Sequence, residues 1–235
     1  MILQNYILPP RWHIEGRDGI CCEGSCTKEK VDDDDMRGPN DTSNWILKGR
    51  VLTGEYPGNA DDNIHSKILS SLLDSGINIF VCLQLESELK AFRAYQQDVL
   101  EMAKQKGIGN IEFINFPMED GGAAESITEL ADFIDLLLSK LEQDSNNRIY
   151  MHCWAGRGRS GLIASCLLGR LYHVSGLEAC RRIQFCYEQR VVGMGESPEY
   201  WGQKLQVINY IKLLKQREQE QEQVQEEQNG NNSNS

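Results

Sequence analysis

Short apolar runs alternate with segments of helical period along most of this 235-residue chain. Apolar runs of strand length occur at 77–84, 110–117 and 148–153, and each is followed by a segment whose apolar residues recur every three or four positions. Strands interleaved with helices favour a parallel arrangement with helices on both sides. The sequence therefore predicts an α/β fold, with a central, mostly parallel sheet flanked by helices on both faces.

The remaining elements follow from turn and capping signals. Segment 44–58 predicts a hairpin with its turn at Lys48-Gly49. Segment 61–76 predicts a helix whose Ile64, Ile68, Leu72 and Leu73 share one face. Further helices are expected at 89–107, 126–143, 159–173, 175–189 and 198–217.

The two ends of the chain differ in composition from its middle. Residues 1–44 mix Gly, Pro, Asp and Cys without a sustained period, and residues 216–235 are rich in Gln, Glu and Asn. We expect an irregular N-terminal extension, one domain over 45–215 and a disordered tail over 216–235. Most of the net charge of −11 lies in these ends, so the domain itself is almost neutral.

This balance excludes several functional classes. A nearly neutral domain has no broad basic surface for nucleic acid. No apolar run approaches the roughly 20 residues of a membrane-spanning helix, and the first residues lack the basic start of a secretory signal. We expect no integral membrane association and a location in the cytoplasm, or in the nucleus. The sequence leaves the oligomeric state open.

The eight cysteines show no disulfide framework. Cys21, Cys22 and Cys26 with His13 are a poor zinc pattern because no second Cys-x2-Cys or His pair follows, so no metal site is predicted. Cys166, Cys180 and Cys186 lie in apolar helical segments and are expected in the core. A disulfide between Cys82 and Cys153 would need Cα atoms within about 7 Å and is not expected.

One segment combines a strand, a Gly- and Arg-rich loop and a helix. The expected strand 148–153 ends at Cys153, and the expected helix starts near Arg159. The loop between them holds Trp154, Ala155, Gly156, Arg157 and Gly158. Small residues let the backbone N–H groups turn inward, and inward amides that lead into a helix N-terminus bind a tetrahedral anion. These residues therefore form a predicted phosphate-binding loop, called below the cysteine loop (153–158).

The residues that border this loop suggest a reaction. The guanidinium of Arg159 can hold two phosphate oxygens at once. The same amides stabilise a thiolate at Cys153, placed at the carboxyl end of a parallel strand, where ligands bind in such sheets. A thiolate beside a bound phosphate ester can attack phosphorus and form a phosphocysteine that water hydrolyses.

The leaving oxygen of such a reaction needs a proton. The segment 117–125, called below the acid loop, carries adjacent carboxyl groups and paired glycines after the strand 110–117. We predict Asp120 as the general acid and keep Glu119 as the alternative, because spacing does not rank neighbouring residues on a loop.

The segment HCWAGRGRSG resembles the signature of the cysteine-based protein phosphatases, His-Cys-x5-Arg-Ser/Thr, at His152, Cys153, Arg159 and Ser160. Asp120-Gly121-Gly122, 33 residues before the cysteine, resembles the acid loop of the dual-specificity and compact tyrosine phosphatases. The similarity covers roughly residues 45–215.

The resemblance implies roles for individual residues. Cys153 would be the nucleophile, Arg159 the phosphate clamp, and Asp120 the acid and later the base. Ser160 would hydrogen-bond the sulfur, and His152 would help to hold the cysteine loop. No metal or organic cofactor is implied. Relatives often carry Ser-Pro-Glu-Gln with the glutamine near the hydrolytic water, whereas Tyr200 stands there in SPEYWGQ and Gln203 follows one turn later.

The predicted function is a protein phosphatase of dual-specificity or tyrosine type that acts on a phosphorylated protein. A phosphoinositide phosphatase is the alternative, because Arg157 adds a basic residue to the cysteine loop. A phosphate-binding module without catalysis is a third reading, which only the Tyr200 departure favours.

Overall fold

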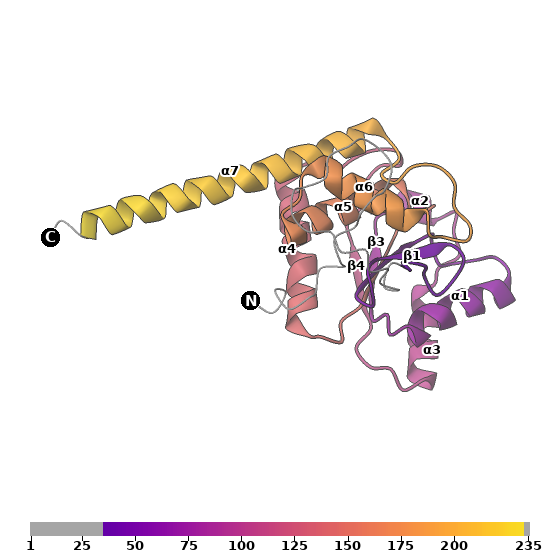
Figure 1. The fold of residues 1–235 in the computed structure, drawn as a ribbon. Helices are drawn as coiled ribbons and strands as arrows, with labels where there is room; N and C mark the ends of the chain where they lie inside the picture. Colours follow the sequence, from indigo (N-terminus) through magenta and orange to yellow (C-terminus); the bar gives the residue numbers. More distant parts are fainter. Residues whose placement is uncertain (1–34, 233–235) are drawn as a thin grey trace, which may run out of the picture.

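The computed structural model describes residues 35–232, which form five strands and seven helices (Figure 1). In chain order the elements are β1 (Ser43–Leu47), β2 (Val51–Gly54), α1 (Asp62–Asp74), β3 (Ile79–Cys82), α2 (Glu86–Leu89), α3 (Gln96–Gln105), β4 (Glu112–Asn115), α4 (Ile127–Gln143), β5 (Ile149–His152), α5 (Gly158–Tyr172), α6 (Gly176–Tyr187) and α7 (Trp201–Asn232).

The strands form one sheet in the order β1-β2-β5-β3-β4. β5 pairs in parallel with β2 and β3, and β3 pairs in parallel with β4. β1 and β2 form the predicted antiparallel hairpin, and Gly49 in its turn adopts a left-handed φ of 69°. The predicted α/β fold with a mostly parallel sheet is confirmed, and β5, which leads to Cys153, is the central strand.

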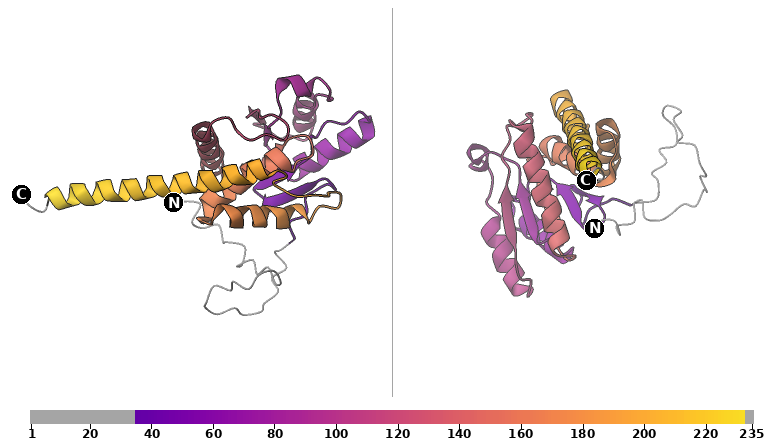
Figure 2. Two further views of the ribbon diagram at one scale, coloured as in Figure 1. Left: turned by 90° about the horizontal axis from the view of Figure 1, so that it is seen from above. Right: turned by 90° about the vertical axis from the view of Figure 1, so that its left-hand side faces the viewer.

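Helices cover the sheet on both faces. α1 packs with α3 on one side, whereas α5 contacts β2, β5 and its neighbours α4, α6 and α7 on the other side (Figures 1 and 2). α5 is buried along nearly its whole length from Gly158 to Gly169. The helix that follows the cysteine loop therefore lies in the interior, which fixes the position of its N-terminus.

The helix expected over 89–107 is shorter in the structure, because α3 covers only Gln96–Gln105, and the segment between Leu89, where α2 ends, and α3 is irregular. Phe92 and Tyr95 in this segment pack their rings against Tyr56, with centroid distances of 4.7 and 5.3 Å. This aromatic packing outweighs the local helical pattern. The buried face of α1 also differs from the prediction, because His65 and Leu69 are buried and Ile64 is exposed.

Regular structure extends beyond both edges of the expected domain. Met36 is only 1% exposed and belongs to the core, and β1 starts at Ser43, so part of the expected extension is folded on the domain. The expected tail from residue 216 continues α7 as far as Asn232. Gln and Glu are strong helix formers, and they prolong a helix that the domain has already nucleated.

α7 leaves the body of the domain after its first turns and ends far from the sheet (Figures 1 and 2). The Cys21, Cys22 and Cys26 cluster lies outside the described residues. No helix within residues 35–232 combines the length and apolar character needed to cross a membrane.

Candidate active site

The cysteine loop joins the end of β5 to the start of α5, as predicted. Gly156 has a left-handed φ of 65°, and a Cβ atom added there would lie 2.0 Å from the carbonyl oxygen of Gly54. The loop therefore lies directly against the end of β2. Only glycine fits this position, because a side chain would meet both a strained φ and the neighbouring backbone.

A buried guanidinium supports the cysteine loop from behind. Arg190 donates hydrogen bonds to the carbonyl oxygens of Ala155 (3.1 Å) and Gly156 (2.8 Å), and its Nε donates to Asn44 (2.6 Å). In a trans peptide the N–H group points away from the carbonyl oxygen. The two carbonyls are thus drawn toward Arg190, and the amide N–H groups of Gly156 and Arg157 face the opposite side of the loop.

Arg159 is 1% exposed and is held by two carboxylates. Its Nη atoms donate to both carboxylate oxygens of Glu88 (2.7 and 3.0 Å) and to Asp120 (2.9 Å), and Nη1 also donates to the carbonyl oxygen of Met118 (3.0 Å). Its Nε has no hydrogen-bond partner among the described residues. Although burial acts to raise the pKa of Glu88, hydrogen bonds from Arg159 and from the Leu85 N–H outweigh it and lower that pKa. Glu88 is therefore an ionised partner that fixes the clamp.

Asp120 lies on the acid loop, which follows β4. Its side chain is 63% exposed, and it lines the same cavity as Cys153 and Arg159. Glu119 does not line this cavity, and its backbone carbonyl accepts the Gly122 N–H in the turn (3.0 Å). Of the two carboxyl groups that the sequence left open, Asp120 is the one that lines the cavity.

His152 and Ser160 are both fully buried next to the cysteine loop. The Nε2 atom of His152 hydrogen-bonds the hydroxyl of Tyr95 (2.8 Å), and burial lowers the pKa of His152 to about 3. His152 is thus a neutral side chain that ties the end of β5 to the start of α3. The hydroxyl of Ser160 has no hydrogen-bond partner among the described residues, so the predicted bond to the Cys153 sulfur is not formed in this structure.

The rim of the cavity is aromatic and electrically balanced. Trp154 is 59% exposed and its ring meets Phe92 edge-on at 5.7 Å, so this side chain both packs and faces outward. Arg157 forms an ion pair with Glu199 and donates to the carbonyl oxygen of Met194 (2.8 Å). The positive potential expected from Arg157 is therefore largely neutralised.

These groups surround one cavity of about 280 Å³. It is lined by Asp120, Gly121, Cys153, Trp154, Ala155, Arg157, Gly158, Arg159, Glu199 and Tyr200. Of the ten residues in the predicted site, His152, Gly156 and Ser160 lie behind the lining and the other seven contribute to it. The predicted site residues thus converge on one place in the fold.

The remaining cysteines of the described chain lie in the interior. Cys166, Cys180 and Cys186 are buried on α5 and α6, as expected. Cys82 is opposite His152 in the β3–β5 register, its thiol is free, and burial raises its pKa. Within residues 35–232, no group of three or more His, Cys, Asp or Glu side chains is arranged to hold a metal ion.

The family model PTP-SAK, described as the DSP-PTPase phosphatase domain of a Swiss Army Knife protein, matches residues 40–190. The chain belongs to this family. Among curated proteins, candidate tyrosine phosphatase 197R of Invertebrate iridescent virus 6 is 28% identical over 152 residues, which cover 64% of this chain and 50% of the relative. Candidate tyrosine phosphatase 067L of Invertebrate iridescent virus 3 is 30% identical over 81 residues, 33% of each protein. The chain thus spans half or less of these relatives.

Solved structures show the same fold. PTPMT1 in complex with PI(5)P has a TM-score of 0.57 at 17% identity and covers 75% of this chain and 99% of its own. Kinase associated phosphatase with its catalytic cysteine replaced by serine has a TM-score of 0.54 at 21% identity, with coverages of 70% and 86%. The architecture is therefore that of the dual-specificity and related cysteine phosphatases.

Three charged residues of the site could not be identified from the sequence. Glu88, Arg190 and Glu199 are 65, 37 and 46 residues from Cys153 along the chain. Each is an ordinary charged residue in its own segment, at a helix or near a helix end. Only the folded arrangement shows that they partner Arg159, the cysteine loop and Arg157.

Proposed function

We propose that this chain hydrolyses phosphate monoesters on proteins, with tyrosine or dual specificity, through a phosphocysteine intermediate. The observation that carries the proposal is the convergence of Cys153, Arg159 and Asp120 on one cavity at the carboxyl end of the central strand. A nucleophile, a cation for the phosphate and a carboxyl group for the leaving oxygen are the parts that this reaction needs.

In the first step the sulfur of Cys153 attacks phosphorus as the bond from phosphorus to the leaving oxygen breaks. The carboxyl group of Asp120 gives its proton to that oxygen, so the substrate leaves as a neutral alcohol or phenol. In the second step water attacks the phosphocysteine and gives a proton to Asp120, and inorganic phosphate and the thiolate are released. Arg159 and the amides of the cysteine loop stabilise the equatorial oxygens in both steps.

The charges at the cavity favour a protein substrate over a phosphoinositide. The structure of PTPMT1 was solved in complex with PI(5)P, so a phosphoinositide is the alternative substrate to compare with a phosphoprotein. The two basic residues that line this cavity, Arg157 and Arg159, each pair with a carboxylate. A substrate with a second phosphate would find no unpaired cation among the lining residues, whereas the exposed rings of Trp154 and Tyr200 suit an aromatic or apolar segment of a peptide.

The first test is hydrolysis of p-nitrophenyl phosphate in the presence of a chelator. We expect turnover by the unmodified chain and its loss in Cys153→Ser. Rates equal to those of Cys153→Ser would leave a phosphate-binding module as the better description.

The second test compares phosphopeptides with mono- and polyphosphorylated phosphoinositides at the same concentration. We expect the higher kcat/KM with phosphotyrosine or phosphothreonine peptides. A preference for phosphoinositides would replace the protein substrate by the lipid and leave the proposed chemistry unchanged.

A further inference from the structure

The acid loop is attached to α7 through two glutamine side chains. Gln206 donates from Nε2 to the carbonyl oxygen of Ala124 (2.6 Å), and its Oε1 accepts the Ala124 N–H (2.8 Å). Gln203 donates from Nε2 to the carbonyl oxygen of Gly122 (2.9 Å). Both glutamines lie beyond residue 190, where the match to the family model ends.

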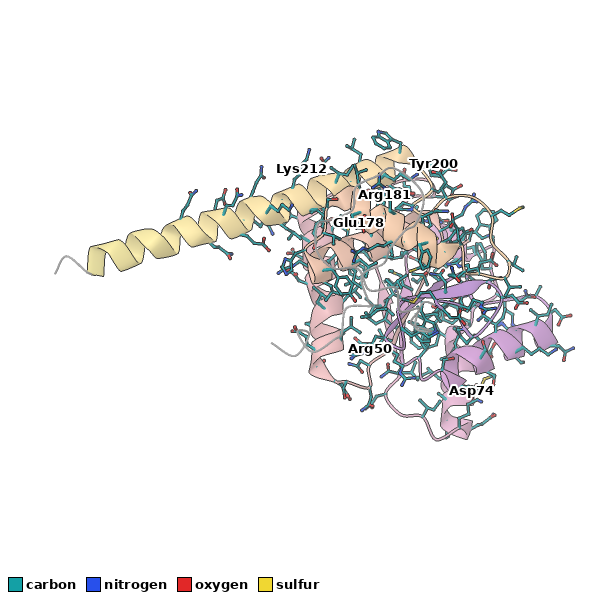
Figure 3. All side chains as sticks on the ribbon, in the orientation of Figure 1. Arg50, Asp74, Glu178, Arg181, Tyr200 and Lys212 are labelled. Atoms are coloured by element: carbon teal, nitrogen blue, oxygen red, sulfur yellow. The ribbon has the colours of Figure 1, made fainter. Side chains whose placement is uncertain are left out.

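Gln203 is itself fixed at the beginning of α7. It is fully buried, and its Oε1 accepts the backbone N–H groups of Glu199 and Tyr200 (both 3.1 Å). The ring of Tyr200, which Figure 3 labels near the start of α7, lies 3.3 Å from the place that a Cβ atom on Gly121 would take. The start of α7 therefore contacts three successive parts of the acid loop, at Gly121, Gly122 and Ala124.

The other end of the acid loop is anchored to the sheet and to the clamp. Met118 is buried, its N–H donates to the carbonyl oxygen of Leu83 (3.1 Å), and its carbonyl oxygen accepts from Arg159 (3.0 Å). Asp120 thus lies between Met118 on one side and the glutamine contacts on the other. Its position is set by both anchors, because the turn between them is only a few residues long.

Gln206 makes two hydrogen bonds to the backbone of one acid-loop residue, Ala124. The side-chain amide of Gln206 thus satisfies both the N–H and the C=O of Ala124. We propose that Gln206, supported by Gln203, is a positioning residue that holds the acid loop so that Asp120 reaches the leaving oxygen. This inference rests on the proposed function, since it takes Asp120 as the general acid.

The test uses two substrates that differ in their need for a proton donor. Phenyl phosphate has the poorer leaving group and depends on the acid more strongly than p-nitrophenyl phosphate does. We expect Gln206→Met to lower kcat/KM for phenyl phosphate about tenfold and for p-nitrophenyl phosphate much less, because a small displacement of a catalytic group is costly. Asp120→Asn should give the same pattern with a larger loss.

The two variants are then combined. If Gln206 acts through Asp120, Gln206→Met causes no further loss in the Asp120→Asn background, since effects on one catalytic group are not additive. Gln219→Met is the matched control, because it makes the same substitution at an exposed position of the same helix. Gln219→Met should leave kcat/KM unchanged for both substrates.

Gln206→Glu provides a second variant that retains an acceptor for the Ala124 N–H and loses the donor. Its second carboxylate oxygen faces the Ala124 carbonyl oxygen, so its loss on phenyl phosphate should be at least as large as that of Gln206→Met. Equal losses on both substrates in both Gln206 variants, or additive losses in the double variant, would overturn the inference. An Asp120→Asn variant with no leaving-group dependence would instead overturn the acid assigned under the proposed function.

Discussion

The cysteine loop and the acid loop face each other across one cavity, yet different forces hold them. Buried ionic groups fix the cysteine loop, with Arg190 behind its carbonyls and Glu88 on the Arg159 that follows it. The acid loop shares Arg159 at Met118 and Asp120, but its far side, at Gly122 and Ala124, is held only by neutral amide hydrogen bonds from Gln203 and Gln206. Net contributions of about 0.5 to 1.5 kcal/mol are usual for a neutral hydrogen bond and about 1.5 to 3 kcal/mol for one to a charged group. The cysteine loop is therefore the more rigidly held of the two loops.

The largest effect is expected for Arg190→Met. The substitution leaves the carbonyls of Ala155 and Gly156 and the Asn44 side chain without their donor in a buried place. We expect a loss of about 4 kcal/mol in the free energy of unfolding and roughly 100-fold in kcat/KM. Urea unfolding and p-nitrophenyl phosphate hydrolysis measure the two quantities.

Arg181→Met is the matched control, because Arg181, labelled in Figure 3, is an exposed arginine on α6, the helix that precedes Arg190. Retention of activity within twofold in a folded Arg190→Met variant would show that the cysteine loop keeps its shape without this cation.

Gly156→Ala should be nearly as severe. The new Cβ atom would lie 2.0 Å from the Gly54 carbonyl oxygen, at a left-handed φ of 65°. Since the neighbour is backbone, either β2 or the cysteine loop must move, and we expect a loss of about 3 kcal/mol in the free energy of unfolding.

Gly49→Ala separates the cost of the left-handed φ from the cost of the contact with β2. Gly49 has a similar φ of 69° but no atom within 4 Å of the added Cβ. Similar losses of stability in Gly156→Ala and Gly49→Ala would mean that the contact with β2 costs nothing.

The buried histidine beside the cysteine loop gives a pH dependence of stability. Burial lowers the pKa of His152 to about 3, whereas an unperturbed histidine titrates near 6.5. Between these values the unfolded chain binds a proton that the folded chain does not, so this contribution to stability is complete above pH 6.5 and is lost as the pH falls toward 3. The expected slope is about 1.4 kcal/mol per pH unit.

Urea unfolding at pH 6.5 and 4.5 checks this prediction. His152→Gln removes the titrating group, so its free energy of unfolding should fall by about 2 kcal/mol less than that of the unmodified chain over this interval. The exposed His173→Gln is the control. Parallel pH profiles for the unmodified chain and His152→Gln would contradict the expectation.

Gly121→Ala should have the smallest effect of the set. Gly121 also has a left-handed φ, of 70°, but the nearest atom to its added Cβ belongs to the half-exposed ring of Tyr200 at 3.3 Å. Because a side chain can move where a backbone cannot, we expect a loss of about 1 kcal/mol in the free energy of unfolding and a change in kcat/KM of less than about fivefold. A loss of unfolding free energy as large as that of Gly156→Ala would show that the acid loop and the cysteine loop are equally rigid.

The same difference explains how much of the site could be predicted. The residues of the cysteine loop and its flanks, from His152 to Ser160, are contiguous in the sequence, so the motif could be recognised without knowledge of the fold. The acid loop has only a short local signal at Asp120-Gly121-Gly122, and its attachment to Gln206 joins residues 82 positions apart. The alternation of apolar strands and amphipathic helices predicted the sheet, whereas the break between α2 and α3 depends on aromatic packing with Tyr56 that no local pattern contains.

Arg159, the phosphate-binding cation of the proposed reaction, is already in contact with the carboxylate of Asp120 before a substrate arrives. A dianion that settles above the Cys153 sulfur competes with this carboxylate for the same guanidinium. In the proposed reaction the substrate therefore separates Asp120 from Arg159, and the freed carboxylate takes up a proton from solvent before it protonates the leaving oxygen. In the proposed reaction, substrate binding above Cys153 and the release of Asp120 are thus coupled through the single guanidinium of Arg159.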